Sequence, residues 1–233
     1  MPDLHWTIPV ARWSFWPATA TATPDVSFVA PMARRRLSAL SRAALQVAFD
    51  CASTLPAVRV VFASRHGELR RTTGILCDIG AGEPVSPTSF SLSVLNAMTG
   101  VFGIERGDRA PASAVSAGAQ TLGYALLEAH AQYATDASSP VLLVYADEPA
   151  DPAYGTIEDE VEGGALAILL DASAQTGQLE CVRTTFADDR SNAFASARCV
   201  TQSEAVRQCL DAKAPVQWRG ATSTWQWNWH EGV

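Results

Sequence analysis

The sequence predicts an α/β fold in which a mixed sheet is sandwiched by helices. Helical patterns alternate with short apolar runs along the chain. The runs at 58–63, 141–146 and 165–170 lack polar alternation, which is typical of strands covered on both faces. With 233 residues, 48% of them hydrophobic, the chain is long enough to bury a sizeable core.

The first helix is expected over 31–52, where Leu37, Leu40, Ala44 and Val47 recur at spacings of three to four residues. This spacing places the four side chains on one face. The pattern therefore predicts an amphipathic helix whose apolar face packs on the sheet.

Two weaker patterns follow this helix. Residues 74–79 form a short apolar run, which we interpret as an extended segment. A helix is expected to begin at Ser86, because Pro87 suits its first turn, and to continue to about Met98. Gly100 would end it.

The most informative stretch is Ala112–Gly118. A short apolar run ends there, small residues turn the chain, and a helix follows to about Tyr133 with Leu122, Leu126 and Ala129 on one face. A strand–turn–helix unit presents one side chain at a helix N-terminus, where enzymes often keep a nucleophile. This stretch is the candidate functional site.

The C-terminal third contains three further elements. A strand at 179–185 is expected to pair with the strand at 165–170. A helix is expected over 203–212 with Ser203 as its cap. Tryptophan at every second position of 225–229 predicts a strand with one aromatic face.

Charge and composition exclude several classes of function. The net charge of -7 argues against non-specific binding to nucleic acid or to an acidic membrane. No apolar run approaches the roughly 20 residues of a membrane span. The N-terminal residues carry no basic segment, so we expect no signal peptide and a cytoplasmic protein. The five cysteines show no metal-site spacing, and no nucleotide fingerprint is present, so we expect no metal and no cofactor.

Several motifs, taken in order, resemble the N-terminal half of the β-ketoacyl synthase family, over about residues 30–170. The turn at Ser113–Gly118 is similar to the family's T-A-C-S-S-G. The strand at Val141–Asp147 is similar to one that ends in G-G-A-D. The other similar segments are Met32–Ser38, Asn96–Gly100 and Glu162–Ala165. The resemblance implies a thiolase-like half-fold.

The departures from the family pattern concern catalysis. In that family the third residue of T-A-C is the acyl-accepting cysteine, and Val115 stands at this position. The family's two active-site histidines, or a His–Asn pair, lie in a second half that this chain is too short to contain. A thioester requires an activated thiolate, which valine cannot supply. We therefore expect no independent condensing activity, and Val115 marks a degenerate site.

Family members that are shortened or lack the nucleophile resemble chain length factors, in particular those of aryl-polyene and xanthomonadin-type pigment synthesis. The resemblance implies an accessory subunit in fatty-acid or polyketide-type synthesis. Its partners would be a ketosynthase subunit, an acyl carrier protein or both, in a homo- or hetero-oligomer. The helix at 114–134 would lie near the shared interface, and Phe90, Leu95 and Met98 are candidates for lining an acyl cavity.

Composition and the resemblance together predict a division of the chain into three segments. Residues 1–30 would form an irregular or short-strand lead-in, and residues 31–185 the domain similar to the N-terminal half of a ketoacyl synthase. Residues 186–233 would form a tryptophan-rich C-terminal extension.

Two alternatives remain open. Ala114–Gly118 nearly fits the G-x-S-x-G motif, so Ser116 could be the nucleophile of a serine hydrolase or thioesterase, with Asp147 and His230 following in hydrolase order. His130 would be a poor base for Ser116, because fourteen residues along the same helix separate the two by about 21 Å at ~1.5 Å per residue. The other alternative is a non-catalytic interaction module that docks its partner through the tail at 218–230.

Overall fold

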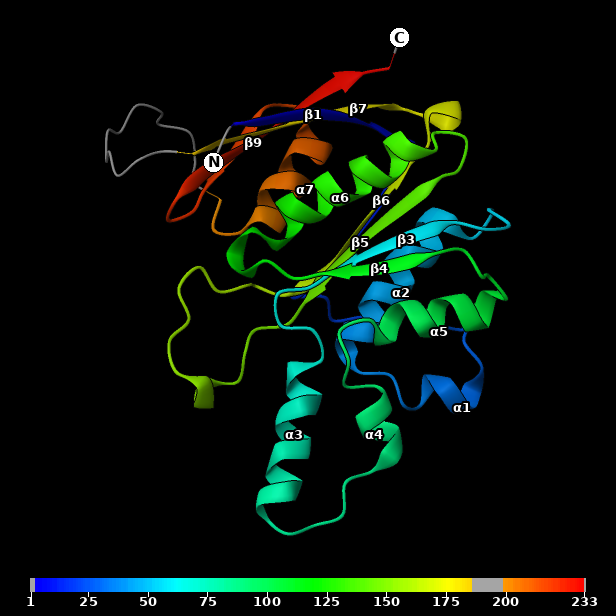
Figure 1. The fold of residues 1–233 in the computed structure, drawn as a ribbon, viewed down its shortest axis with the longest axis vertical. Coiled ribbons are helices and arrows are strands. Elements are labelled where there is room, and N and C mark those ends of the chain that lie inside the picture. The colour runs from blue at the N-terminus through cyan, green and yellow to red at the C-terminus, as the bar shows by residue number, and fades with distance from the viewer. Residues whose placement is uncertain (1–2, 186–198, 233) are drawn as a thin grey trace.

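The computed structural model describes residues 3–185 and 199–232. It confirms a mixed α/β fold, with two sheets where one central sheet was expected, arranged with the helices in four layers (Figure 1). The strands are β1 (Leu4–Val10), β2 (Arg12–Pro17), β3 (Arg59–Ala63), β4 (Ala112–Val115), β5 (Val141–Asp147), β6 (Gly164–Leu170), β7 (Gly177–Thr185), β8 (Val216–Arg219) and β9 (Ser223–Glu231). The α-helices are α1 (Pro31–Arg34), α2 (Ala39–Ala52), α3 (Leu69–Gly80), α4 (Pro87–Ser91), α5 (Ala97–Arg106), α6 (Thr121–Thr135) and α7 (Gln202–Ala212).

The mixed sheet has the strand order β2-β6-β5-β3-β4. β3 is parallel to β4 and β5, whereas β6 is antiparallel to both β5 and β2. All seven residues of β5 are buried, as expected for a central strand without polar alternation. The carboxyl ends of β3, β4 and β5 therefore meet at one edge of the sheet.

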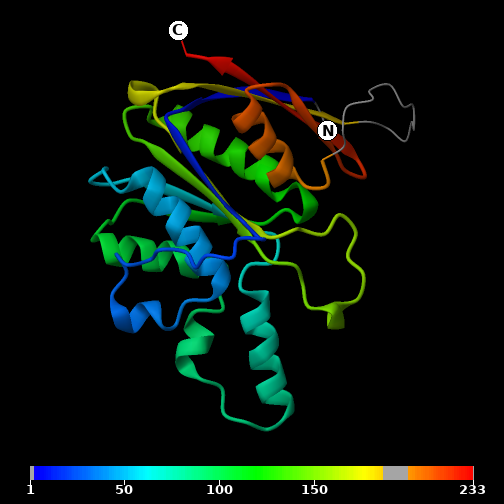
Figure 2. The ribbon, with the colours of Figure 1, turned by 180° about the vertical axis from the view of Figure 1, so that it is seen from behind.

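Helices cover both faces of the mixed sheet. Ala44, Ala48 and Ala52 on α2 are fully buried, and such small side chains let this helix pack closely on β5 and β6. α5 packs beside α2 on the same face, and α6 covers the opposite face (Figures 1 and 2). Two hydrophobic clusters result, one on each side of the sheet.

The antiparallel sheet, with the order β1-β7-β9-β8, forms the outermost layer over α6 and α7 (Figure 1). Trp225 and Trp227 point inward from β9 and are completely buried. The predicted pairing of the strand at 179–185 with the strand at 165–170 is wrong, since β7 pairs with β1 and β9. β7 alternates buried and less buried residues along its length, because one face of this sheet carries polar side chains instead of another layer.

The N-terminal lead-in contains two strands, which agrees with the short-strand form of the prediction. β1 joins the antiparallel sheet and β2 joins the mixed sheet, so the two sheets are connected directly by Ala11. The division of the chain into three segments stays a prediction.

Several predicted element boundaries are corrected. The helix expected over 31–52 is divided into α1 and α2, because Ser38 caps a new helix by accepting the Ser41 N–H. Residues 74–79 belong to helix α3, although their β-branched, apolar composition resembles a strand. Of these residues Ile75 alone is buried, which is the pattern of a surface helix with a narrow apolar face.

The next two helices also begin or end elsewhere than predicted. The helix expected from Ser86 to Met98 is two helices, α4 and α5, and Gly100 lies inside α5. The left-handed residue that ends α5 is Gly107, with φ 64°. Thr201, not Ser203, caps α7 by accepting the Glu204 N–H.

α3 and α4 project from the layered body as an arm, which we define as residues 69–96 (Figures 1 and 2). Ile75 is the only buried residue of α3. Apolar side chains are exposed on this arm at Leu76, Ile79, Phe90 and Val94, with Phe90 65% exposed. Among the described residues, no helix is long and apolar enough to cross a membrane.

Candidate functional site

The strand–turn–helix unit predicted at Ala112–Gly118 is present. β4 ends at Val115, Gly118 adopts φ 60°, and a short 3-10 helix leads into α6 at Thr121. Glycine suits this left-handed conformation, because a Cβ would strain it. The Val115 side chain is half-buried and packs against the hydrophobic cluster beneath the antiparallel sheet, while Ser116 is exposed.

Two backbone N–H groups around the start of α6, those of Ala117 and Gly123, already have hydrogen-bond partners. The Gly123 N–H donates to Gln202 Oε1 on α7 at 2.8 Å. Thr121 Oγ1 accepts the Ala117 N–H at 2.9 Å and donates to the Gly118 carbonyl. A helix N-terminus stabilises negative charge through such N–H groups. Two of the donors that could serve an anionic intermediate here are therefore engaged within the protein.

Asp147 organises the loops at the carboxyl ends of the parallel strands. It follows β5 and is 1% exposed. Its carboxylate accepts from Ser64 Oγ at 2.7 Å, from the Arg65 N–H at 2.7 Å and from the His66 N–H at 3.1 Å. Burial raises the pKa of Asp147, although these hydrogen bonds oppose the shift. Because it supports backbone and hydroxyl groups, Asp147 has a structural role here.

The loop at 64–67 is tied to the acidic segment that precedes β6. His66 Nε2 lies 2.8 Å from Glu160 Oε1, and the Arg65 guanidinium donates to the Glu158 and Asp159 carbonyls. Ser116 Oγ donates to the Arg65 carbonyl at 3.0 Å. The candidate turn, this loop and the acidic segment thus form one hydrogen-bonded assembly.

The residues of the proposed serine triad are not brought together. Ser116 contacts a backbone carbonyl, and Asp147 holds the 64–67 loop. His230 lies on β9 in the other sheet, where its Nε2 is 3.1 Å from Glu180 Oε2. His130 lies ten residues into α6, and its Nδ1 is buried without a hydrogen bond in the described structure.

The cysteines do not supply a substitute nucleophile. Cys51, Cys181, Cys199 and Cys209 are buried, and Cys77 is exposed on the arm. Burial raises the pKa of Cys51 and of Cys209 to about 12, so both stay protonated thiols at neutral pH. Within the described parts of the chain, no group of three or more His, Cys, Asp or Glu side chains could hold a metal ion.

The tail does not provide a docking surface through its large aromatic side chains. Trp218, Trp225 and Trp227 are at most 2% exposed and form part of the hydrophobic cluster around α6. Gln120 Oε1 accepts hydrogen bonds from Trp225 Nε1 at 2.9 Å and from Ser223 Oγ at 2.7 Å. The tail therefore closes the protein's own core.

Sequence reasoning missed Gln202, Ser64 and Glu160 as parts of this site. Gln202 accepts from Gly123 in α6, and Glu160 contacts His66 in the 64–67 loop; both lie far along the chain from these partners, and no local pattern marks them. Ser64 follows a strand, and its position at the carboxyl end of β3 could have suggested a role beside Asp147.

The model of the β-ketoacyl synthase N-terminal domain matches residues 10–228. The chain belongs to this family. Its Val115 stands where the motif resemblance places the family's cysteine, at the end of β4 and before the helix. No curated protein sequence matches the chain significantly.

Solved structures of ketosynthases share the fold. The complex of the ketosynthase ApeO with its chain length factor ApeC from Xenorhabdus doucetiae has a chain that aligns with a TM-score of 0.75 and 23% identity. This alignment covers 96% of the present chain and 99% of that chain. The ishigamide ketosynthase/chain length factor aligns with a TM-score of 0.53 and 18% identity, over 64% of this chain and 49% of that chain.

A β-ketoacyl synthase from Burkholderia phymatum STM815 aligns with a TM-score of 0.56 and 14% identity, over 70% of this chain and 50% of that chain. The present chain thus matches about half of two ketosynthase-family chains and nearly all of one shorter relative. These likenesses establish a ketosynthase-type fold in a half-length chain.

Proposed function

We propose that this protein is a chain-length-factor-like subunit that does not condense by itself and that assists a ketosynthase in aryl-polyene-type synthesis. The observation that carries the proposal is Val115 at the end of β4. The turn keeps the backbone shape of a nucleophile site, but its side chain has no reactive atom. The engaged N–H groups of Ala117 and Gly123 support the same conclusion.

The extent of one structural match supports the accessory role. One chain of the ketosynthase and chain length factor complex from Xenorhabdus doucetiae is matched over 99% of its length. A half-length, ketosynthase-like protein therefore has a counterpart in a two-component complex. The aryl-polyene part of the proposal rests on this likeness and on the motif resemblance.

The proposed partner is a ketosynthase subunit, and the structure offers two surfaces for it. β4 is at the edge of the mixed sheet and pairs with β3 alone among the described strands, so its other edge is available for a strand of a partner. The arm exposes Leu76, Ile79 and Phe90, each more than half exposed. Exposed apolar side chains concentrated on one projection are typical of a protein interface.

The three candidates for an acyl-cavity lining have different environments. Phe90 is exposed on the arm. Leu95 is half-buried and packs closely over Gly67, where an added Cβ would be 3.0 Å from Leu95 Cδ1. Met98 is 1% exposed within the cluster between α2, α5 and the mixed sheet. Phe90 is therefore the candidate that can reach a cavity shared with a partner, whereas Met98 belongs to this protein's own core.

The proposal is tested by capturing the tagged protein from its native cells and identifying the bound proteins by mass spectrometry. A ketosynthase in one-to-one amount is the expected result, and an acyl carrier protein would extend the partnership to the carrier of the growing chain. The purified pair should condense acyl thioesters, while this chain alone should not. Condensation by this chain alone, or its recovery without a ketosynthase, would overturn the proposal.

A further inference from the structure

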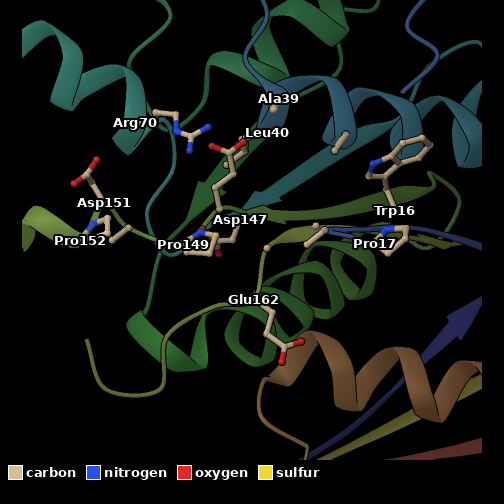
Figure 3. A pocket seen from close by; sticks show the side chains of 16 residues that line it. Trp16, Pro17, Ala39, Leu40, Arg70, Asp147, Pro149, Asp151, Pro152 and Glu162 are labelled. Atoms are coloured by element: carbon tan, nitrogen blue, oxygen red, sulfur yellow. The ribbon is translucent and has the colours of Figure 1, made fainter. Parts of the chain in front are cut away.

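A cavity of about 480 Å³ lies beside Asp147, at the carboxyl end of β5 (Figure 3). It is enclosed by the end of β2, the start of α2, the segment after β5 and the glycines that begin β6. Its volume is within the range of about 300–1,000 Å³ that small-molecule sites occupy. Trp16, Leu40 and Pro149 form an apolar wall of this cavity. The function proposed above does not involve it.

Two opposite charges, Arg70 and Glu148, line the cavity and interact electrostatically. Glu148 is half-buried, accepts the Leu40 backbone N–H and is stabilised by the positive charge of Arg70. Burial raises the pKa of Glu148, and Arg70 opposes that shift. The Arg70 guanidinium makes no hydrogen bond with the described residues, and Figure 3 shows it reaching from α3 toward Ala39 and Leu40. Its N–H donors are therefore free for a ligand.

The charged pair lies at the junction of two hollows. A second cavity of about 240 Å³ shares Ala39, Arg70 and Glu148 with the first. Its remaining lining is polar, from Ser38, Glu68 and Arg71. A molecule that binds between Arg70 and Glu148 can extend an apolar group into the larger cavity and a short polar group into the smaller one.

The other carboxylates nearby are already engaged or point elsewhere. Asp147 accepts three hydrogen bonds from the 64–67 loop, and Asp151 accepts the Ala153 N–H. Glu162 points away from Arg70 (Figure 3). An anionic ligand would meet Glu148, and a cationic ligand would meet Arg70, so like-charge repulsion disfavours both. A zwitterion would lose the hydration of two full charges on binding, which costs more than the desolvation of a neutral polar group.

We propose that this cavity binds a neutral secondary amide, whose carbonyl accepts from Arg70, whose N–H donates to Glu148 and whose apolar substituent lies against Trp16, Leu40 and Pro149. A trans secondary amide presents its acceptor and its donor on opposite edges, with one substituent at each end. This arrangement suits a charged pair that lies between two hollows. The site goes beyond the accessory role proposed above and does not depend on it.

The test uses the full chain and ligand-observed NMR with four probes of similar size: N-benzylacetamide, benzylammonium, phenylacetate and phenylalanine. N-benzylacetamide should bind at millimolar concentration, and the other three should bind about tenfold more weakly. Ala39→Phe places a ring in the cavity from an exposed position and should abolish binding. Ala174→Phe, at an exposed site on the 3-10 helix Ala172–Ala174, is the matched control and should bind as the unaltered protein does.

A charge variant distinguishes this site from non-specific apolar binding. Glu148→Gln removes the like charge that opposes an anion, so phenylacetate should gain affinity about tenfold while circular dichroism stays unchanged. The proposal is overturned if a charged probe binds best to the unaltered protein, if no probe binds, or if Ala39→Phe leaves amide binding intact. An unchanged phenylacetate affinity in Glu148→Gln would also overturn it.

Discussion

Gly123 on α6 lies directly beneath the ring of Trp225 on β9. A Cβ added at residue 123 would be 2.6 Å from Trp225 Cζ3, closer than real side chains pack. The indole Nε1 of Trp225 donates to Gln120 Oε1, one turn earlier on the chain, at 2.9 Å. The glycine therefore lets the antiparallel sheet rest on the first turn of the helix that follows the degenerate site.

Replacing Gly123 by alanine should lower the free energy of unfolding by about 1–3 kcal/mol, because the added methyl overpacks the ring. In an exposed helix the same change would be stabilising by up to about 1 kcal/mol. Urea denaturation followed by circular dichroism measures the difference. Gly100→Ala in α5 is the control, since a Cβ there meets nothing within 4 Å and should stabilise the protein. Equal effects of the two variants would contradict the packing described for Trp225.

Asp147→Asn should lower the free energy of unfolding by about 1–3 kcal/mol, because an amide cannot accept all the buried donors that the carboxylate accepts. Denaturation in urea at neutral pH gives the value. Asp151→Asn is a suitable comparison, since asparagine caps a helix start as well as aspartate does and should change stability little. A loss of similar size in both variants would argue against a special role for Asp147.

Glu180→Gln should make the free energy of unfolding depend less on pH in the acid range. Hydrogen bonds from Asn228, His230 and His5 lower the pKa of Glu180 from 4.5 to about 2. A carboxylate with a depressed pKa in the folded state stabilises the protein above its unfolded pKa, and this contribution is lost as pH falls from about 4.5 to about 2.

The expected loss in Glu180→Gln at pH 7 is about 1 kcal/mol or less, because the site is near the surface. Between pH 4.5 and 2 the unfolding free energies of the two proteins should converge. Glu231→Gln, which removes an exposed pair with Lys213, should have the smaller effect at pH 7. A constant difference across the acid range would show that Glu180 does not titrate as described.

Replacing Ile79 and Phe90 on the arm by serine should weaken ketosynthase capture at least tenfold, since apolar anchors dominate protein interfaces. The same double variant should keep its stability within about 0.5 kcal/mol, because both side chains are more than half exposed. Ile104→Ser is the control, as Ile104 is 79% exposed but lies on α5 outside the arm. Capture that is weakened equally by Ile104→Ser would point to a different interface.

Ser116→Ala should leave any hydrolysis of aryl esters or acyl thioesters unchanged, because no described histidine contacts the Ser116 hydroxyl. Its stability should change by less than about 1 kcal/mol, as only one exposed hydrogen bond to the Arg65 carbonyl is lost. An assay with p-nitrophenyl acetate checks the activity. Loss of hydrolysis in this variant would support the serine enzyme instead of the accessory subunit.

Local patterns predicted the mixed α/β fold and the shape of the candidate turn, because continuous apolar strands and amphipathic helices have periods that are visible in the chain. They failed where tertiary packing decides. Residues 74–79 read as extended because β-branched residues favour strands, and helix α3 overrides this preference. The pairing of β7 was misassigned because sequence neighbours usually pair, whereas β7 pairs with segments from both ends of the chain.

The motif at Ala112–Gly118 was sufficient to locate the turn and Val115. The partners of α6 and of the 64–67 loop come from α7 and from the acidic segment before β6, as Gln202 and Glu160 show. Such long-range partners follow no periodicity, so only the folded structure reveals that the donors at the start of α6 are already engaged.

The antiparallel sheet combines β1 with β7, β8 and β9, and this has a consequence for the order of folding during synthesis. The mixed sheet with α2 and α5 can assemble once Leu170 has left the ribosome. The tryptophan cluster over α6 must wait until residues near Glu231 emerge. Until then the pair formed by β1 and β7 lacks β9 and its tryptophans, and one face of α6 is uncovered, so this nascent chain has a late, vulnerable stage that chaperones or an already folded partner could protect.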